Sequence, residues 1–463
     1  MLRKPLDLKL DPTSLYAKLY EAYHTCALLE SADGPERLAR FSLVVFDPQG
    51  EVAMTRGRLR VTGDIGLAPH DGERTTDFLR RVVAAHKVPA AAEGGPAFAG
   101  GLVGYTGYEY TEALERLPPR RGPATFPDLQ YGLFLDGVVF DRATGTVEYF
   151  TTGKDRSRDL LAVAEEDIPD HALRFGPARR NVERSEFENA VRTAKERIVD
   201  GDVFQVVLSK RIDAPYHGHL FGYYEALKRV NPSPYMYCLK LGHRAIVGSS
   251  PEMLARVGPP SDGVLDGVAR ARNLCIETFP IAGTRARGKD PAADEQLGAE
   301  LLADPKERAE HAMLVDLARN DVGRIARAGS VQVAEYARVE RYSHVQHIVS
   351  RVTGELALGK DAFDAFDSVF PAGTVSGAPK VEAMKIIREL EPDPRGPYAG
   401  SVGYFSLNGN ADAAITIRTL TAVGGTASVQ TGAGIVFDSD PGREYDETEA
   451  KARALLAVME GYT

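Results

Sequence analysis

Two pairs of glutamates in the second half of the chain have a spacing that suits metal binding. Glu307 and Glu310 lie three residues apart in a segment with helical periodicity, and Glu444 and Glu447 repeat this spacing near the C-terminus. Residues three apart share a helix face, where two like charges lower stability unless a cation compensates them. Mg2+ prefers such oxygen ligands, so we predict a magnesium site, although a single pair of this kind is usually a solvated helix face.

Cationic side chains near these glutamates indicate an anionic substrate. Lys451 follows Glu447 by four residues, one turn along the same helix face. Arg418 falls in the alternating segment 413–423, out of phase with its isoleucines, so we expect it to point away from the apolar face of a strand. An arginine there could bind a carboxylate through two parallel hydrogen bonds, whereas a lone arginine is more often a surface residue.

Two glycine-containing loops, TGAGIVFDSD (431–440) and PAGTVSGAPK (371–380), could also bind carboxylates through backbone N–H groups. Neither has the order G-x-x-x-x-G-K-[ST], and no G-x-G-x-x-G motif follows a strand and opens a helix. Nucleotide and nicotinamide cofactors are therefore not indicated. The H-E-x-x-H and G-x-S-x-G motifs are absent as well, which excludes the zinc proteases and serine hydrolases that carry them.

The elements that must position these residues read as an α+β fold. The first part, to about residue 150, shows one helical segment at 14–29 and short alternating segments typical of antiparallel strands. A charged, proline-containing stretch then connects it to a second part, which opens with a capping box formed by Ser185 and Glu188. Further helices are predicted at 291–303, 305–321 and 445–461, and further strands at 245–250, 331–356, 399–407 and 413–423. Few clean βαβ units occur, which disfavours a doubly wound sheet.

Composition excludes several classes of protein. The 463 residues carry a net charge of −9, which disfavours a general nucleic-acid surface. No apolar run approaches the roughly 18 residues of a membrane span, and the charged N-terminus lacks a signal-peptide core, so we predict a cytoplasmic protein. The three cysteines, Cys26, Cys238 and Cys275, are far apart and are predicted to be small buried side chains.

Nine motifs, taken in order, resemble a known family. They are GDVFQVVLSKR (201–211), NPSPYMY (231–237), GSSPEML (248–254), PIAGTRARG (280–288), EHAMLVDLARNDVGR (310–324), PAGTVSGAPKVEAM (371–384), AITIRT (414–419), TGAGIV (431–436) and DETEAKA (446–452). In this order they are similar to the chorismate-utilising enzymes, and closely so to the anthranilate synthase component I family. The resemblance implies two orthogonally packed, mainly antiparallel β-sheets flanked by helices, a four-layer α/β/β/α arrangement. It also implies an N-terminal domain at 1–155, a connection at 156–184 and a chorismate-binding catalytic domain at 185–463.

Two positions separate the activities within this superfamily. Enzymes that add water carry a lysine where this chain has Gln205, and a neutral amide cannot act as that general base, so ammonia is the expected nucleophile. Aminodeoxychorismate synthases typically carry a lysine where this chain has Ala282, and alanine cannot add covalently to the ring. The resemblance thus implies synthesis of anthranilate and pyruvate from chorismate and ammonia, the first committed step of tryptophan biosynthesis.

The resemblance also assigns roles to single residues. Glu307, Glu310, Glu444 and Glu447 would surround Mg2+, with Glu310 and Glu447 as direct ligands. Glu252 resembles the general acid that protonates the departing hydroxyl, and His347 the histidine linked to pyruvate loss; Gln205 and Thr374 complete the catalytic set. The substrate-binding residues would be Gly283, Thr284, Tyr398, Arg418, Gly432, Gly434 and Lys451. The segment 257–279 looks longer and more irregular than is usual in the family, which affects the positions of Gly283 and Thr284 most.

Regulation and partners follow from the same resemblance. Two segments resemble the halves of a tryptophan feedback site, with Leu29, Glu30 and Ser31 in one and Asn231, Pro232, Ser233, Tyr235 and Met236 in the other. No cysteine lies in a nucleophile elbow, so ammonia is expected from solution or from a separate glutamine amidotransferase subunit, the latter in a hetero-oligomer. Two alternatives remain: aminodeoxychorismate synthase component I, disfavoured by Ala282, and a catalytically silent tryptophan-binding homologue, disfavoured by the intact glutamate pairs.

Overall fold

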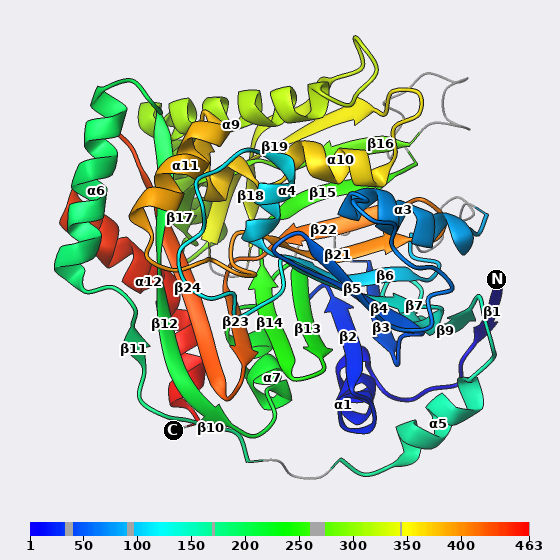
Figure 1. Ribbon diagram of the computed structural model, residues 1–463. Coiled ribbons are helices and arrows are strands. Elements are labelled where there is room, and N and C mark those ends of the chain that lie inside the picture. Colours follow the sequence, from blue (N-terminus) through cyan, green and yellow to red (C-terminus); the bar gives the residue numbers. More distant parts are fainter. Residues whose placement is uncertain (33–39, 90–96, 169–171, 260–273, 343–344, 463) are drawn as a thin grey trace.

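Two large antiparallel β-sheets form the centre of the computed structural model, and their strands cross one another (Figure 1). The structure describes residues 1–462 except 33–39, 90–96, 169–171, 260–273 and 343–344. The first sheet has the order β1 (Leu2–Pro5), β9 (Thr146–Thr151), β8 (Asp136–Asp141), β3 (Phe41–Phe46), β2 (Thr25–Glu30), β13 (Tyr235–Leu241), β14 (Arg244–Ser250), β23 (Thr419–Val423), β24 (Thr426–Ile435), β12 (Gln205–His217) and β10 (Arg174–Phe175). The short strands β11 (Arg179–Arg180) and β20 (Gly377–Ala378) also pair with β12.

The second sheet has the order β17 (Ile281–Ala286), β19 (Val345–Glu355), β16 (Cys275–Thr278), β15 (Met253–Gly258), β22 (Ala411–Ile415), β21 (Ser401–Ser406), β6 (Gly101–Thr106), β7 (Leu129–Phe134), β4 (Gly50–Thr55) and β5 (Arg58–Gly63), and β18 (Gln332–Arg341) pairs with β19. Each sheet contains a block of strands from before residue 155 and a block from later in the chain, which meet at the pairs β2–β13 and β6–β21. The connection 156–184 therefore does not separate one sheet from the other, and the proposed division of functions between 1–155 and 185–463 stays a prediction.

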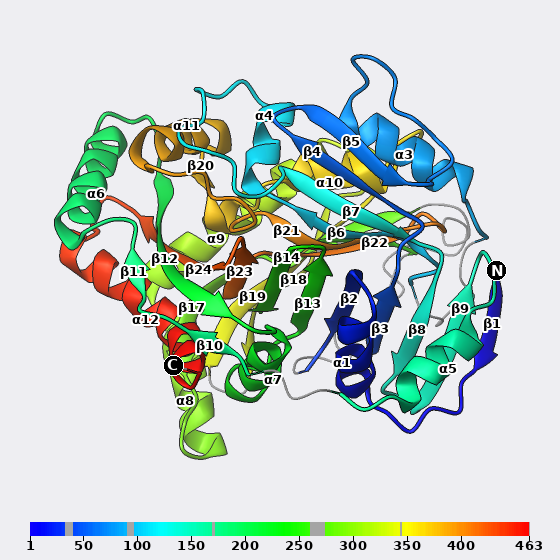
Figure 2. The ribbon, with the colours of Figure 1, turned by 60° about the horizontal axis from the view of Figure 1, so that its bottom comes forward.

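Helices cover the outer face of each sheet, which confirms the four-layer α+β prediction (Figures 1 and 2). The first sheet is covered by α1 (Pro12–Ala22), α5 (Ser157–Glu165), α6 (Arg184–Val199), α7 (Phe221–Val230) and α12 (Pro441–Glu460). The second is covered by α3 (Thr75–Ala85), α8 (Pro291–Ala303), α9 (Pro305–Gly323) and α10 (Ala362–Val369), while α4 (Thr111–Leu114) and α11 (Lys380–Leu390) lie near their junction. Side chains such as Tyr105, Phe134, Tyr237 and Ile246 are buried between the two sheets.

Three local predictions were wrong. The helix predicted at 14–29 ends at Ala22, and its second half is strand β2, where apolar residues pair with β3 and β13. The N-cap of α6 is Glu183, two residues before the predicted Ser185. The capping box is formed by Glu183 and Glu186, and the backbone N–H of Glu183 donates to the Glu186 carboxylate at 2.8 Å. The strand predicted at 413–423 is two strands, β22 and β23, which belong to different sheets.

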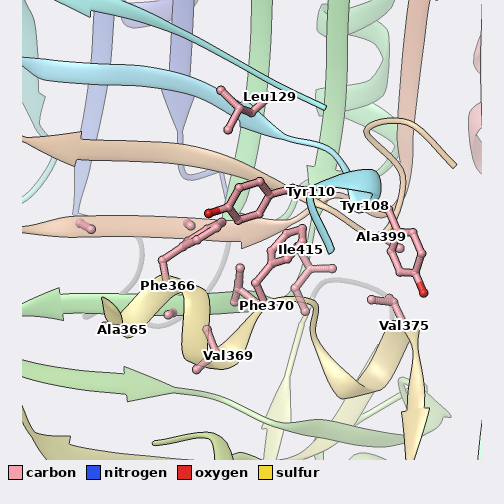
Figure 3. Close-up of a cluster of buried hydrophobic side chains, with 14 of the residues drawn as sticks. Tyr108, Tyr110, Leu129, Ala365, Phe366, Val369, Phe370, Val375, Ala399 and Ile415 are labelled. Carbon is pink, nitrogen blue, oxygen red and sulfur yellow. The ribbon is translucent and has the colours of Figure 1, made fainter. Parts of the chain in front are cut away.

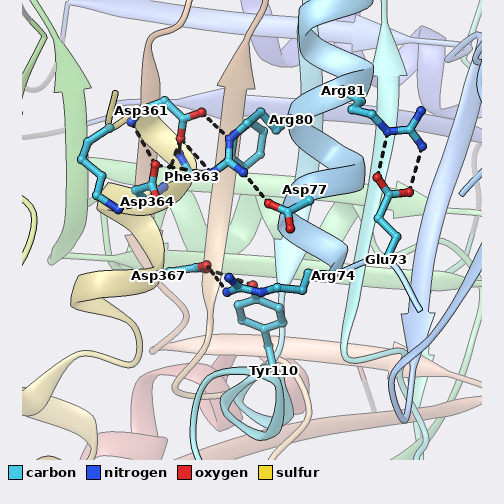
Figure 4. Close-up of polar contacts among 11 residues, drawn as sticks. Glu73, Arg74, Asp77, Arg80, Arg81, Tyr110, Asp361, Phe363, Asp364 and Asp367 are labelled. Atoms are coloured by element: carbon cyan, nitrogen blue, oxygen red, sulfur yellow. Dashed lines mark hydrogen bonds and ion pairs between the residues drawn. The ribbon is translucent and has the colours of Figure 1, made fainter. Parts of the chain in front are cut away.

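The helix α10 is held by an apolar face and a charged face. Its Phe366 stacks on Phe370 with ring centroids 5.3 Å apart and meets Phe405 edge-on at 5.4 Å, in the cluster that Figure 3 shows around Tyr110 and Ile415. On its other side Arg80 of α3 donates to Asp361, the N-cap of α10, at 2.6 Å (Figure 4). These contacts fix the position of α10, and with it the start of the loop that follows, residues 370–379.

None of the described helices combines the length and the apolar character that a membrane span requires.

We expect Phe366→Ala to lower the free energy of unfolding by about 3–5 kcal/mol, because the change leaves a cavity among packed rings. Phe366 is 5% exposed. Urea unfolding followed by circular dichroism would measure the loss, with Leu358→Ala, at a fully exposed position, as the control. Equal stabilities of the two variants would contradict the packing described here.

Candidate active site

Four predicted glutamates face one another across two helices. Glu307 and Glu310 lie on α9, and Glu444 and Glu447 lie near the start of α12. Burial, and then the charges of Glu307 and Glu447, raise the pKa of Glu310; burial and the charge of Glu447 raise the pKa of Glu444. The two pairs therefore share one electrostatic environment, and their assignment to Mg2+ stays a prediction.

Only part of this negative charge is balanced by the protein. Lys451 lies 2.7 Å from Glu447, and Arg285 lies 3.3 Å from Glu307. Among the described residues, Glu310 has neither a hydrogen-bond donor nor an ion-pair partner. No three acidic, histidine or cysteine side chains of the described chain converge as a ready-made metal cluster. The set of oxygen ligands nevertheless fits Mg2+, which keeps several waters and takes only one or two carboxylates from a protein.

A bulge in β17 brings the predicted substrate residues Gly283 and Thr284 beside His347. Gly283 adopts a positive φ of 66°, and a Cβ there would lie 2.9 Å from the Glu307 carboxylate. His347 Nδ1 lies 2.8 Å from the Gly283 carbonyl oxygen and 3.2 Å from Thr284 Oγ1. Because a carbonyl oxygen only accepts, Nδ1 carries the proton and Nε2 is the basic nitrogen. Burial lowers the pKa of His347, so the ring is neutral at pH 7.

Two glycines of β24 make room for two functional side chains. A Cβ at Gly432 would lie 2.7 Å from the Tyr398 hydroxyl oxygen, and one at Gly434 would lie 2.5 Å from Gln205 Nε2. Either side chain would thus be displaced by any residue larger than glycine. Lys451 Nζ donates to the Gly432 carbonyl oxygen at 2.9 Å, which connects this strand to the glutamates of α12.

Gln205, the first residue of β12, carries an unused acceptor. The residue is 5% exposed, and its Oε1 has no hydrogen-bond partner among the described residues. Buried polar atoms are nearly always paired, so an unpaired one calls for a ligand or a water. An amide oxygen in this position suits a molecule with an N–H group.

Glu252 and Arg418 lie where the chain crosses between the sheets. Glu252 follows β14 of the first sheet and precedes β15 of the second, whereas Arg418 lies between β22 of the second and β23 of the first. The crossings are bonded to each other: Ile415 N donates to the Glu252 carbonyl oxygen at 3.0 Å, and Ser249 N donates to that of Arg418 at 3.1 Å. Arg418 has a φ of 50°, so it does not alternate along a strand as predicted.

The Glu252 carboxyl has the properties of a general acid. It is 8% exposed and accepts a hydrogen bond of 2.8 Å from Thr374 Oγ1. Burial raises its pKa to about 8, against the lowering effects of Thr374 and Arg418. A carboxyl with this pKa is protonated at pH 7 and can donate its proton.

The two predicted feedback segments lie side by side. β2 pairs with β13 so that Glu30 faces Met236, and Ala32 N donates to the Ser233 carbonyl oxygen at 3.1 Å. The Glu30 carboxylate already accepts from Tyr224 OH at 2.7 Å and from Lys228 Nζ at 2.8 Å. Its contribution is to hold helix α7 against β2, and a ligand role for this segment stays a prediction.

The sequence analysis missed Arg395, which joins the backbone segments that carry Thr374 and Gln205. Arg395 is 4% exposed, pairs with Glu391 at 2.6 Å, and donates to the carbonyl oxygens of Val375 at 2.8 Å and Val207 at 2.7 Å. These carbonyls follow Thr374 by one residue and Gln205 by two. The only signal in the sequence was the acid four residues before the arginine, in a proline-rich stretch. The irregular segment 257–279 lies mostly outside the described residues, apart from the end of β15 and strand β16.

Comparisons with known proteins identify relatives of the chain. A family model for chorismate binding enzyme matches residues 24–457. Anthranilate synthase component 1 of Methanothermobacter thermautotrophicus is 46% identical over 462 residues, which cover 99% of this chain and 95% of that protein. The crystal structure of anthranilate synthase component I from Streptococcus pneumoniae matches with a TM-score of 0.77 and 36% identity, over 90% of this chain and 92% of that one. The menaquinone-specific isochorismate synthase of Escherichia coli, 20% identical with a TM-score of 0.71 over 99% and 93% of the two chains, shares the fold.

We expect the raised pKa of Glu252 to make stability depend on pH. Between the ordinary value of 4.5 and about 8, the folded carboxyl keeps a proton that the unfolded one has lost, so stability falls as pH rises through this range. Glu252→Gln removes this titration, and the melting temperature of the variant relative to the native chain should rise from pH 5 to pH 9. The exposed substitution Glu295→Gln is the control; a constant difference for Glu252→Gln would contradict the raised pKa.

Proposed function

The chain belongs to the chorismate-binding enzyme family, and from this membership we propose that it makes anthranilate and pyruvate from chorismate and ammonia. The observation that carries the proposal is the 46% identity to an anthranilate synthase component 1 over 99% of the chain. The neutral, partnerless amide oxygen of Gln205 supports it, since no basic group is present there to activate water. Ala282, buried against Ile348 in the sheet, offers no amine that could add to the ring.

Glu252 supplies the proton that the leaving hydroxyl needs. Its protonated carboxyl is held by Thr374 and lies near Arg418, whose charge is available to the substrate carboxylates. Hydroxide is a poor leaving group, so protonation in the transition state is the main requirement of the first step. Ammonia adds at C2 of the ring while the ring double bonds shift and the C4 hydroxyl leaves as water, with one N–H of the ammonia directed at Gln205 Oε1.

His347 takes part in the second step, in which pyruvate leaves and the ring becomes aromatic. Its Nδ1–H is fixed by the Gly283 carbonyl oxygen, so Nε2 faces the reaction as a base or as a hydrogen-bond acceptor. Gly283, Thr284, Tyr398, Gly432, Gly434 and Lys451 would bind the substrate carboxylates. Loss of a ring proton to Nε2 balances the elimination of pyruvate.

The metal is proposed to be Mg2+, held by Glu310 and Glu447, with Glu307 and Glu444 around them. When bound, Mg2+ would hold the ring carboxylate of chorismate and neutralise the charge that develops as the hydroxyl leaves. Burial raises the pKa of Glu310 most, and the further rise caused by the charges of Glu307 and Glu447 would disappear on binding.

We further propose two partners. The related proteins are named as a first component, which supports a second one, and a separate glutamine amidotransferase subunit that releases ammonia is the proposed supplier. Tryptophan is the proposed inhibitor, bound where Leu29, Glu30 and Ser31 adjoin Asn231, Pro232, Ser233, Tyr235 and Met236.

The first experiment is to incubate the purified chain with chorismate, Mg2+ and ammonium chloride, and to follow anthranilate fluorescence with mass analysis of the products. Anthranilate that disappears on chelation of Mg2+ is the expected result. Aminodeoxychorismate or isochorismate would contradict the roles given to Ala282 or Gln205, and unchanged chorismate would favour a silent regulatory protein.

Glu310→Gln should weaken Mg2+-dependent activity strongly. Removal of a direct ligand should raise the Mg2+ concentration for half-maximal activity at least about tenfold. Titration of activity with Mg2+ measures the effect, with Glu295→Gln as a charge-matched control on the exposed face of α8. A curve identical to that of the native chain would remove Glu310 from the metal site.

The turnover number should fall as pH rises through about 8, because Glu252 must be protonated to act as an acid. The profile should be measured at saturating neutral ammonia, whose fraction rises with pH. Glu252→Gln should lower the turnover number by roughly 10²–10⁴-fold and abolish the alkaline limb. An alkaline limb that persists in the variant would assign it to another group.

A further inference from the structure

The loop 370–379, which contains Thr374, connects the two sheets. It begins at the end of α10, which packs on the second sheet, and it ends at β20 and the start of α11, which adjoin β12 of the first sheet (Figure 2). Within the loop, the Thr374 hydroxyl donates to Glu252 Oε1 at 2.8 Å. The position of this hydroxyl therefore depends on how both ends of the loop are held.

Lys380 joins the two ends of this loop to helix α9. It is the first residue of α11, and its Nζ donates to the carbonyl oxygen of Val369, the last residue of α10, at 3.0 Å. The same Nζ lies 2.7 Å from the carboxylate of Asp321, in the last turn of α9. The Lys380 and Asp321 side chains are only 10% and 8% exposed. One buried ammonium group thus connects three helices.

The stability of the helices that carry them does not explain this ion pair. A helix has a partial positive charge at its N-terminal end and a partial negative charge at its C-terminal end. Lys380 at the start of α11 and Asp321 at the end of α9 are therefore both placed unfavourably. A buried ion pair also gains little over apolar side chains of similar volume, because both charges lose their hydration. Such departures from local rules are expected where geometry serves function.

Thr374 lies between two attachments of the loop. On one side, Arg395 donates to the Val375 carbonyl oxygen at 2.8 Å, which holds the second half of the loop to the first sheet. On the other side the loop meets α9, since a Cβ at Gly373 would lie 2.0 Å from Leu317 Cδ2. A shift of α9 and α10 relative to the first sheet would therefore move the Thr374 hydroxyl away from the general acid.

We propose that Lys380, paired with Asp321, is a positioning residue that holds the loop so that the Thr374 hydroxyl stays bonded to Glu252 during proton transfer. This inference rests on the proposed function, in which Glu252 gives its proton to the leaving hydroxyl and becomes a carboxylate. A hydrogen bond to a carboxylate is stronger than one to a neutral carboxyl. Thr374 thus stabilises the carboxylate that forms, and Lys380 acts through Thr374 without contact with the substrate.

The double variant Lys380→Met with Asp321→Val tests this role without leaving a buried charge unpaired. Removal of both charges is often neutral for stability, so the melting temperature should stay within about 4 °C of the native value. The turnover number with ammonium should fall roughly tenfold or more, while the KM for chorismate stays within about twofold. Lys385→Met with Glu382→Gln removes an exposed ion pair of the same helix and is the control that should keep native turnover.

A mutant cycle with Thr374→Val separates positioning from a general loss of structure. If Lys380 acts through Thr374, the double substitution should lower turnover by less than about twofold in a chain that already carries Thr374→Val. Asp321→Asn, which keeps the size of the side chain, is a milder second variant for the same cycle. Losses that multiply in the combined variants, or native turnover in the double variant, would overturn the proposal.

Amide hydrogen exchange of the segment 370–379 gives a readout that does not need activity. Exchange in the double variant should be roughly tenfold faster than in the native chain, because the ends of the loop are released. Unchanged exchange would overturn the proposal. A native chain that makes no anthranilate from ammonium would overturn the proposed function and the catalytic role of Lys380 with it, while faster exchange would still show that Lys380 holds the loop.

Discussion

The site depends on one constraint: the chain crosses between its two sheets twice at adjoining positions, and backbone hydrogen bonds join the crossings. Ile415 N bonds to the Glu252 carbonyl oxygen, and Ser249 N to that of Arg418. Neither residue can then shift without breaking pairs in both sheets, so an acid and a cation stay in register. A catalytic group gains most from such fixed geometry, because binding energy is not spent on aligning it.

The same constraint places ionisable side chains in the interior. Some of them are neutralised by a proton or by an ion pair, and others are not. Glu252 stays protonated and bonded to Thr374, and Arg395 has its charge balanced by Glu391 and its remaining donors satisfied by backbone carbonyls. At the glutamates of α9 and α12, in contrast, burial and then neighbouring glutamate charges raise the pKa of Glu310 and of Glu444. The compensated groups, Glu252, Arg395 and Glu391, thus stabilise the backbone around the site. The uncompensated charge of the glutamates lies where a cation and an anionic substrate are proposed to bind.

Elements with strong local signals could be predicted from the sequence, whereas elements fixed by distant contacts could not. The helix α8 has the predicted bounds, and α9 starts at the predicted residue, because an aspartate N-cap followed by proline defines each start. The helix prediction for 14–29 was wrong because helical periodicity continues into residues that form β2 and pair with β13, more than two hundred residues away. The break at Thr416–Arg418 follows from the crossing of the sheets. Motif order identified the candidate site residues, but the burial of Arg395 depends on tertiary contacts and leaves no local pattern.

The pairing of an early strand with a late one in both sheets also bears on how the chain folds during synthesis. β2 must wait for β13 and β6 for β21, so that Thr106 finds its partner Ser401 only after nearly three hundred further residues are made. Until then the ribosome carries apolar strands with open edges, which are prone to pair with other chains. Long-range pairing of this kind also makes folding slow. Efficient production of the protein should therefore depend on chaperones that shield nascent strands.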